Sequence, residues 1–374
     1  MFEKLEELAK NNKKISDFHI RSGSPLGYRQ TGEIYKVKEV IVKAQDLMDL
    51  MASNCNEIET KRFQETHELD SSVTLSGLRF RANFYKTING PAAVLRRVET
   101  VMPEMAQFDL PQVLYDIIDM HKGLVLVTGP TGSGKTSTLY SCLSKINTEE
   151  KNIVTIEDPV EFNLEGINQI PVNPKIGMDF VSGLSSVVRQ DPDVIMIGEI
   201  RDIETASIAI QAALTGHLVF TTLHTRSAAG SVTRLIDMGI QPFLINSAFI
   251  GVIGQRLVRV NCPNCKKEQL EENITGTKEQ LLLKQIKERY KDLKLYKGAG
   301  CKYCDEKGYK GRIGIFEILV LTEEVRELIQ EKASSEKIVK KAMEGGMKTM
   351  KDDGMLKIAE GITSLEEIAR VLDV

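Results

Sequence analysis

The sequence predicts an α/β protein of two domains, a small α+β domain at residues 1–100 and a larger domain at residues 112–374. In the first part, short strand-like runs are separated by glycine-containing turns, which is typical of an antiparallel sheet. From residue 112 onward, continuous apolar runs alternate with helix-like segments, which indicates a parallel sheet covered on both faces. The chain has 374 residues, of which 42% are hydrophobic and 27% charged, so it is long enough to bury a sizeable core.

The first domain is expected to begin with a helix at Phe2–Lys10. The strand-like runs that follow are FHIRSG, LGYRQTGEIYKV, SSVTLSGLRFRANFYK and PAAVLRRV, and a helical stretch at Ala44–Phe63 interrupts them. Residues 101–111, VMPEMAQFDLP, contain two prolines and no clear period. We interpret this segment as the linker between the domains.

The second domain is predicted to alternate strands and helices. Strands are expected at GLVLVTGP, NIVTIED, DVIMIGE and HLVFTTLH, with helices after Lys135 and at Ile203–Leu214. Residues 262–312 surround a helix rich in Lys and Glu at Thr277–Lys291, and residues 321–374 have the pattern of several short helices. No apolar run reaches the roughly 18 residues of a membrane helix, and the charged start does not resemble a signal peptide. We therefore expect a cytoplasmic protein that reaches a membrane only through a partner.

A complete phosphate-binding motif lies between the first of these strands and its helix. The segment GPTGSGKT has the pattern G-x-x-x-x-G-K-[ST] in the required strand–loop–helix context. Its backbone N–H groups and the helix N-terminus suit phosphate, Lys135 should reach the β- and γ-phosphates of ATP, and the Thr136 hydroxyl should ligate Mg²⁺. The predicted nucleotide-binding residues are Gly129, Pro130, Thr131, Gly132, Ser133, Gly134, Lys135, Thr136 and Ser137.

Acidic residues and histidines accompany three further strands of the predicted sheet. They are Glu157, Asp158 and Glu161 after one strand, Glu199 after the next, and His217 and His224 around the third. Because ligands gather at the carboxyl ends of parallel strands, we expect these groups to lie near the phosphate-binding loop. A carboxylate there can hold the Mg²⁺ shell or orient the attacking water, and a histidine can bond the γ-phosphate. Each group could instead cap a strand end, pack, or form a surface ion pair.

Together these segments resemble the secretion-ATPase superfamily, which powers type II secretion and type IV pili. TGPTGSGKT is similar to its Walker A motif, TIEDPVEF to its Asp box, IMIGEIRD to its Walker B motif and GHLVFTTLHT to its His box. ISDFHIR, at residues 15–21, resembles the segment that opens the family's N-terminal PAS-like domain. The resemblance extends nearly from end to end. It implies a PAS-like domain at residues 1–100 and a RecA-like ATPase domain at residues 112–374.

The resemblance also implies catalytic roles for individual residues. Glu161 would be the general base or orient the attacking water, and Glu199 would support Mg²⁺ and that water. An arginine that reaches a phosphate from another domain or subunit neutralises transition-state charge and contributes roughly 10³–10⁵ in rate. The residues matched to the family's arginines and His-box histidines are Arg81 in FRANF, Arg96 in VLRRV, Arg201, His217 and His224. Without the family match, Arg81 and Arg96 fit exposed strand arginines equally well.

Four of the six cysteines form two C-x₂-C pairs, Cys262 with Cys265 and Cys301 with Cys304. Each pair lies in a turn, and four thiolates suit tetrahedral Zn²⁺, with a redox dithiol or an iron–sulfur cluster as the alternatives. A closed four-Cys site has no open position for catalysis, so we expect structural zinc that stabilises the local fold. The isolated Cys55 and Cys142 are interpreted as packing residues.

Two features of the sequence favour different branches of the family. The cysteine module and the tail, with GRIGIFEILV, resemble the assembly and secretion branch, whereas the short segment before ISDFHIR is typical of retraction and some competence-pilus ATPases. We favour a motor for type IV pilus assembly or type II secretion, with retraction or a competence pilus as the alternative. The family implies a homohexamer, peripheral to the inner membrane, that works with a platform protein there and with cytoplasmic docking proteins.

Two other classes of protein would carry the same loop. A nucleic-acid motor predicts a basic stripe with interleaved aromatic residues, but the net charge is -3, Trp is absent and aromatic residues are 6%. We therefore expect no direct contact with nucleic acid. A regulator that binds ATP without turnover predicts a lost lysine or carboxylate, and the motifs retain both.

Overall fold

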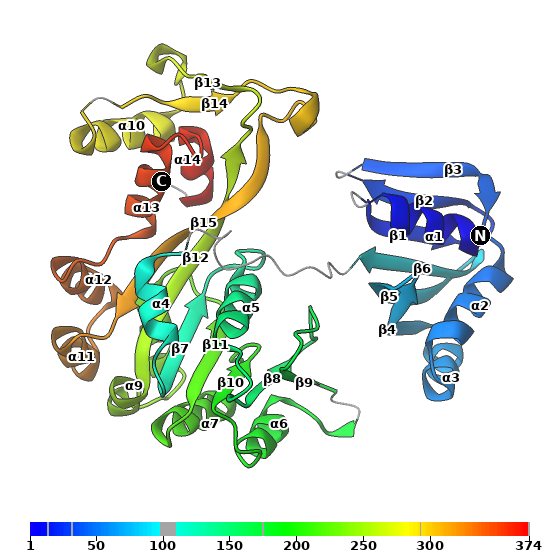
Figure 1. The fold of residues 1–374 in the computed structure, drawn as a ribbon, viewed down its shortest axis with the longest axis horizontal. Helices are drawn as coiled ribbons and strands as arrows, with labels where there is room; N and C mark the ends of the chain where they lie inside the picture. The colour runs from blue at the N-terminus through cyan, green and yellow to red at the C-terminus, as the bar shows by residue number, and fades with distance from the viewer. Residues whose placement is uncertain (13–14, 31–32, 98–109, 174–175, 292, 373–374) are drawn as a thin grey trace. The chain divides into compact units, whose positions relative to one another are not determined.

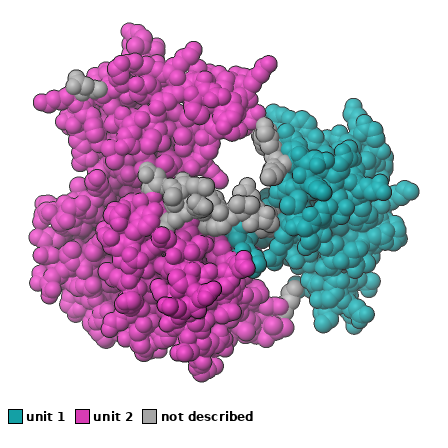
Figure 2. All heavy atoms as spheres, viewed as in Figure 1, with its two compact units in different colours: residues 1–102, 161–163 teal, residues 103–160, 164–374 magenta. Residues whose placement is uncertain are grey.

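The structure, a computed structural model, describes residues 1–12, 15–30, 33–97, 110–173, 176–291 and 293–372 (Figure 1). The chain divides into two compact units, which Figure 2 colours separately. The N-terminal unit comprises residues 1–102 and 161–163, and the C-terminal unit comprises residues 103–160 and 164–374. The linker expected at residues 101–111 lies outside the described residues except for Leu110 and Pro111.

The N-terminal unit is built on an antiparallel six-stranded sheet with the strand order β3-β2-β1-β6-β5-β4. Its elements are α1 (Phe2–Asn11), β1 (Ile15–Arg21), β2 (Pro25–Gln30), β3 (Glu33–Ile41), α2 (Ala44–Asn54), α3 (Glu57–Thr66), β4 (Glu68–Leu75), β5 (Leu78–Thr87) and β6 (Gly90–Arg97). The single helix expected at Ala44–Phe63 is in fact two helices. The reason is Asn56, whose side chain accepts a hydrogen bond from the Glu59 N–H and thereby caps a new helix.

The two faces of this sheet differ in chemistry. Side chains alternate along each strand, so Phe18 and Phe80 point to the core that α1, α2 and α3 share with the sheet. Asp17, Arg81 and Arg96 belong to the alternate positions and lie on the opposite face. The second face therefore gathers the charged residues of the central strands.

The C-terminal unit contains a seven-stranded sheet with the order β15-β12-β7-β11-β10-β8-β9. The strands are β7 (Gly123–Thr128), β8 (Ile153–Glu157), β9 (Asn168–Pro171), β10 (Val194–Ile197), β11 (Leu218–Leu223), β12 (Phe249–Asn261) and β15 (Tyr309–Val320). The expected parallel arrangement holds from β12 to β9, but β15 is antiparallel to β12, so the sheet is mixed. The departure arises because β12 and β15 are the two arms of a long hairpin whose ends carry the cysteine pairs.

Helices and two short strands complete the C-terminal unit. They are α4 (Gln112–Ile118), α5 (Lys135–Ile146), α6 (Phe180–Val187), α7 (Ile203–Leu214), α8 (Ala228–Asp237), α9 (Pro242–Ala248), β13 (Lys266–Glu268), α10 (Thr277–Arg289), β14 (Tyr296–Gly298), α11 (Glu323–Gln330), α12 (Ser335–Glu344), α13 (Met350–Ala359) and α14 (Leu365–Leu372). The helix predicted at Ile203–Leu214 has those bounds, and the tail is helical as expected. In the described part of the chain, no helix has both the length and the apolar character that crossing a bilayer requires.

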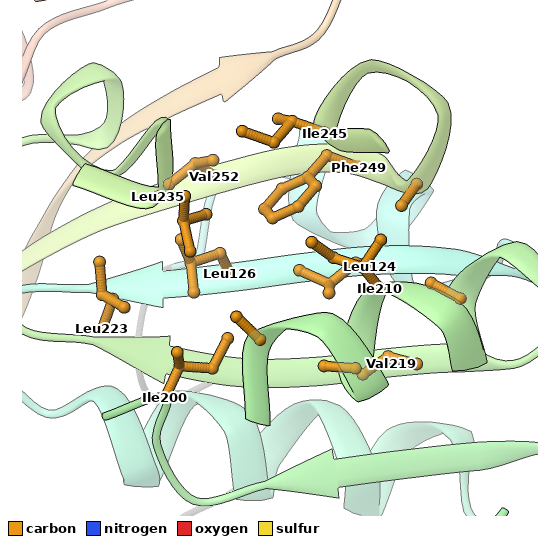
Figure 3. Packing of buried hydrophobic residues seen from close by; sticks show 14 of the residues in the cluster. Leu124, Leu126, Ile200, Ile210, Val219, Leu223, Leu235, Ile245, Phe249 and Val252 are labelled. Atoms are coloured by element: carbon orange, nitrogen blue, oxygen red, sulfur yellow. The ribbon is translucent and has the colours of Figure 1, made fainter. Parts of the chain in front are cut away.

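The core of this unit explains why its strands are continuously apolar. β7, β10 and β11 are buried along their whole length. Figure 3 shows side chains of β7, β11 and β12 packed with those of the neighbouring helices, among them Leu126, Val219, Val252, Ile210 and Leu235. A strand buried on both faces needs apolar residues at every position, which gives the runs seen in the sequence.

Candidate nucleotide site and tetracysteine cluster

The phosphate-binding loop connects β7 to α5, and its shape requires glycine. Gly134, with φ +87°, is the N-cap of α5, a conformation that L side chains rarely adopt. At Gly129, a Cβ atom would lie 2.4 Å from the backbone oxygen of Gln255 and 2.6 Å from Ser133 Oγ. The loop can therefore pass close to β12 only without side chains at these positions.

Two polar side chains are buried inside the loop. Lys135 is 8% exposed, and its Nζ donates to the backbone oxygen of Gly129 at 2.9 Å. Burial lowers the pKa of Lys135, and the nearby Glu199 partly offsets this effect. The buried Ser133 Oγ has no hydrogen-bond partner among the described residues. A buried cation beside an unsatisfied hydroxyl fits an anionic ligand such as a phosphate, because each gains a partner.

The other loop residues lie at the surface. Pro130, Thr131 and Thr136 are exposed, and Ser137 is half-buried. Thr136 is the second residue of α5, so its hydroxyl lies at the positive end of the helix. This position suits a metal ion that is also held by phosphate oxygens.

A cluster of charged groups lies at the carboxyl ends of β8, β10 and β11. One carboxylate oxygen of Glu199 pairs with Arg201, and the other lies 3.0 Å from His224 Nε2. Arg201 also reaches Asp158, with Nη2 3.4 Å from Oδ2. Burial acts to raise the pKa of Glu199, but the hydrogen bonds from Arg201 and His224 outweigh it and lower that pKa. Glu199 is therefore ionised at neutral pH and is suited to hold a cation.

His217 lies elsewhere, so the expectation that both histidines lie at the carboxyl ends of strands is wrong for it. It precedes β11, and its Nδ1 lies 2.8 Å from the backbone oxygen of Ala212. The six residues of β11, at about 3.3 Å each, separate it from His224. A catalytic role for His217 stays a prediction that this cluster does not support.

Glu157, the first acid of the Asp box, is buried and has a structural role. Glu157 is 3% exposed and accepts hydrogen bonds from Tyr140, from Thr155 at 2.6 Å and from Gln169 at 3.1 Å. A carboxylate whose oxygens are occupied in this way ties β8 to α5 and β9. It is not placed to activate water.

The remaining predicted catalytic residues belong to the N-terminal unit. Glu161 is grouped with this unit, where its Oε1 lies 3.8 Å from Arg81 Nη2. Arg81 of β5 and Arg96 of β6 are direct cross-strand partners, with side chains that are 47% and 71% exposed. The approach of these three residues to a nucleotide stays a prediction.

Gln255, in the middle of β12, is a residue that the sequence reasoning missed. Its side chain is 1% exposed, its Oε1 accepts from Thr138 Oγ1 of α5 at 2.8 Å, and its Nε2 lies against Gly134. Within the described residues, Nε2 has no hydrogen-bond partner. The available signal was a glutamine inside the apolar run FIGVIGQRLV, because a polar side chain in a buried strand needs a partner.

We expect Gln255→Leu to lower the free energy of unfolding by about 1–3 kcal/mol, because the Thr138 hydroxyl would remain buried without its acceptor. Chemical denaturation measures this loss. Adding Thr138→Val should restore most of the stability, since both partners are then apolar. If the losses of the two single variants instead add up in the double variant, the hydrogen bond is not what fixes α5 to β12.

The tetracysteine cluster has the dimensions of a metal site. The four Sγ atoms lie within 4.8 Å of one another, with Cys262–Cys301 and Cys265–Cys304 both at 3.8 Å and Cys301–Cys304 at 3.7 Å. These separations exclude disulfides, in which the two sulfurs are about 2.05 Å apart. A tetrahedron with zinc–sulfur bonds of about 2.3 Å has edges of about 3.8 Å. The donor set and its size therefore fit Zn²⁺.

The backbone around the cluster stabilises a thiolate at Cys304, whereas burial raises the pKa of Cys265 to about 12. Cys304 Sγ accepts from the N–H groups of Cys301 and Gly308, each at 3.2 Å. Burial opposes ionisation, yet these hydrogen bonds lower the pKa of Cys304 to about 7. Close packing supports the turn, because a Cβ on Gly298 would lie 1.8 Å from the Gly308 oxygen. The cluster thus joins the ends of β12 and β15 and closes the segment that holds β13, β14 and α10.

Comparison with known proteins gives one consistent family. The family described as "Type II/IV secretion system protein" matches residues 6–370. The type II secretion system ATPase E of Vibrio cholerae is 40% identical over 370 residues, which are 95% of this chain and 72% of that protein. The type IV pilus assembly ATPase PilB of Thermus thermophilus is 45% identical over 300 residues, 78% of this chain and 33% of that protein. The crystal structure of the pilus retraction motor PilT with bound ADP has a TM-score of 0.78 at 28% identity, covering 99% of this chain and 96% of that chain.

Proposed function

Because this chain belongs to the type II/IV secretion system protein family and is an ATPase, we propose that it is a motor that assembles a type IV pilus or the pseudopilus of a type II secretion system. The observation that carries the chemistry is that Lys135, buried in the phosphate-binding loop, lies within electrostatic reach of Glu199, whose carboxylate contacts His224 at the strand ends. Retraction of a pilus, or a competence pilus, is the second candidate, because PilT also shares the fold.

In the proposed reaction, each part of the site acts on the triphosphate of ATP. Lys135 and the backbone N–H groups of the loop bind the β- and γ-phosphates. Mg²⁺ held by Thr136 and Glu199 would neutralise charge on the phosphate oxygens. Arg201 and His224 fix the two oxygens of Glu199, so its carboxylate does not need to reorganise when charge develops.

Residues of the N-terminal unit complete the proposed mechanism. Glu161 takes the proton of the attacking water, and Arg81 and Arg96 neutralise charge on the transferring phosphoryl group. In the resembling family, such residues reach the phosphate from another domain or subunit, and catalysis that requires them would couple hydrolysis to movement. This coupling is the physical basis of the proposed motor.

The tetracysteine cluster supports the assembly or secretion branch over retraction. In the resembling family, this module marks the type II secretion and pilus-extension ATPases, and the retraction branch lacks it. The curated relatives named above at 40% and 45% identity are a secretion ATPase and a pilus assembly ATPase. With Zn²⁺ bound, the module would be a rigid end of the β12–β15 hairpin.

The same proposal includes the assembly of the motor. We propose a homohexamer at the cytoplasmic face of the inner membrane, with a platform protein and cytoplasmic docking proteins as partners. The N-terminal unit would be the PAS-like domain, and the C-terminal unit the RecA-like domain. Neither unit is expected to contact nucleic acid.

We expect Glu161→Gln to abolish phosphate release while ATP binding stays intact, because an amide cannot accept the proton of water. Steady-state release of inorganic phosphate and binding of a fluorescent ATP analogue measure the two effects separately. Glu165→Gln, an exposed acid four residues further along the chain, is the matched control and should hydrolyse normally. Normal phosphate release by Glu161→Gln would show that Glu161 is not the general base. If the unaltered protein releases no phosphate even with its partner present, the proposed motor function is wrong.

A further inference from the structure

Four charged residues form one straight row across the N-terminal sheet. In the strand registers, Asp17 of β1 is opposite both Arg29 of β2 and Arg96 of β6, and Arg96 is opposite Arg81 of β5. The row therefore contains three arginines and one carboxylate on four neighbouring strands. All four residues lie on the face opposite the helices.

Asp17 is the only one of these four side chains that is buried. It is 7% exposed, its Oδ1 accepts from Arg96 Nε at 2.8 Å, and its Oδ2 accepts from Ser16 Oγ at 2.8 Å. Arg29 Nε lies further away, 4.0 Å from Oδ2. Burial acts to raise the pKa of Asp17, but the hydrogen bonds from Arg96 and Ser16 lower it below its ordinary value. Asp17 is thus a buried anion whose shortest contact with an arginine is to Arg96.

The atoms that make this contact determine the direction of Arg96. Asp17 bonds Nε, the nitrogen nearest the backbone, and no group of the described residues bonds the terminal Nη atoms. The guanidinium is anchored at one edge, while its side chain is 71% exposed. Its outer edge, with the terminal N–H donors, has the fork geometry that binds phosphate oxygens.

Arg81, the cross-strand neighbour of Arg96, indicates which kind of ligand the outer edge of the guanidinium binds. Two like charges directly opposite each other on antiparallel strands are destabilising, and Arg81 and Arg96 are such a pair. An anion between them would turn the repulsion into a shared attraction. Each arginine already has one carboxylate partner, Arg96 with Asp17 at 2.8 Å and Arg81 with Glu161 at 3.8 Å, and the exposed outer edges of both guanidinium groups can still donate to a shared oxyanion.

We propose that Asp17 is a positioning residue, which holds Arg96 by its Nε atom so that the terminal nitrogens are presented to the phosphate of ATP. This inference rests on the proposed function of Arg96. Asp17 contacts no substrate and acts only through the arginine. Its buried charge orients Arg96 before ATP arrives, so that less conformational entropy is lost at the moment of reaction.

The test is a double-mutant cycle on the full chain, with kcat and KM for Mg-ATP measured by phosphate release. Asp17→Asn preserves the shape of the side chain and removes its charge, and we expect kcat to fall about 10-fold to 100-fold with KM nearly unchanged. In the Arg96→Ala background, the same substitution should change kcat by less than about twofold. Equal losses in both backgrounds, or a normal kcat for Asp17→Asn, would overturn the inference.

Two further variants keep the test decisive. Asp70→Asn removes an exposed carboxylate from the same face, where it accepts from Asn83 Nδ2 at 2.8 Å, and should leave kcat unchanged. If Asp17→Asn does not fold, Arg96→Lys replaces it, because lysine keeps the charge without the fork and should lose kcat similarly. Full activity of Arg96→Lys would reject the inference. If the unaltered protein released no phosphate, the proposed function itself would be rejected instead.

Discussion

Lys135→Ala is expected to lower kcat/KM for ATP hydrolysis by at least about 10²-fold, the largest effect of any single substitution in the phosphate-binding loop. Lys135 is buried, donates to the Gly129 oxygen at 2.9 Å, and has a pKa lowered by burial. Keeping a desolvated ammonium costs free energy, which phosphate oxygens would repay through charge-assisted hydrogen bonds. Alanine removes that cation from the place where transition-state charge develops. Phosphate release and equilibrium ATP binding measure the loss.

The matched control lies on the same helix. Lys145 is an exposed lysine in the last turn of α5, so Lys145→Ala should hydrolyse ATP at the normal rate. The melting temperature of Lys135→Ala should equal or exceed that of the unaltered protein, because the substitution removes a buried charge. Activity above about one tenth of normal would show that the loop does not bind the reacting phosphates.

The parts of the site that follow local patterns could be predicted from the sequence. The loop needs glycines, a lysine and a hydroxyl in a fixed order, so eight consecutive residues, GPTGSGKT, define it. Glu199 and His224 are 25 residues apart, yet each follows a buried strand, and these two strands are parallel neighbours, so the side chains meet. The same rule was misapplied to His217, because this residue precedes β11 and therefore lies at the amino end of that strand.

The parts that depend on strand register could not be predicted. Asp17 and Arg96 are 79 residues apart, and Thr138 and Gln255 are 117 residues apart. Their contacts exist because β1 pairs with β6 and β12 lies beside β7, and no local signal fixes these pairings. The antiparallel edge strand β15 was missed for a related reason, since its direction is set by the cysteine hairpin rather than by its own apolar pattern.

Removal of the Zn²⁺ that we propose for the tetracysteine cluster is expected to unfold the cysteine module and leave the nucleotide site largely intact. Structural Zn²⁺ sites contribute an apparent free energy of about 10–16 kcal/mol, which is comparable to the whole stability of a domain, about 5–15 kcal/mol. Cys262→Ser with Cys304→Ser removes one ligand from each pair. Elemental analysis should find about one zinc per chain in the unaltered protein and almost none in the variant, and limited proteolysis should then cut within residues 266–300.

Control measurements distinguish a structural zinc site from an iron–sulfur cluster and from a redox dithiol. Cys55→Ser, a half-buried cysteine in the N-terminal unit, should retain full zinc content and normal resistance to protease. ATP binding should survive in the double variant, because Gln255 contacts the loop from the middle of β12, about six residues before that strand ends at Asn261. A visible charge-transfer band and bound iron would indicate an iron–sulfur cluster, and a reversible disulfide would indicate a redox pair. Either result would contradict the zinc assignment. Loss of zinc together with local unfolding, and with neither of these signs, would support a structural zinc site at the end of the β12–β15 hairpin.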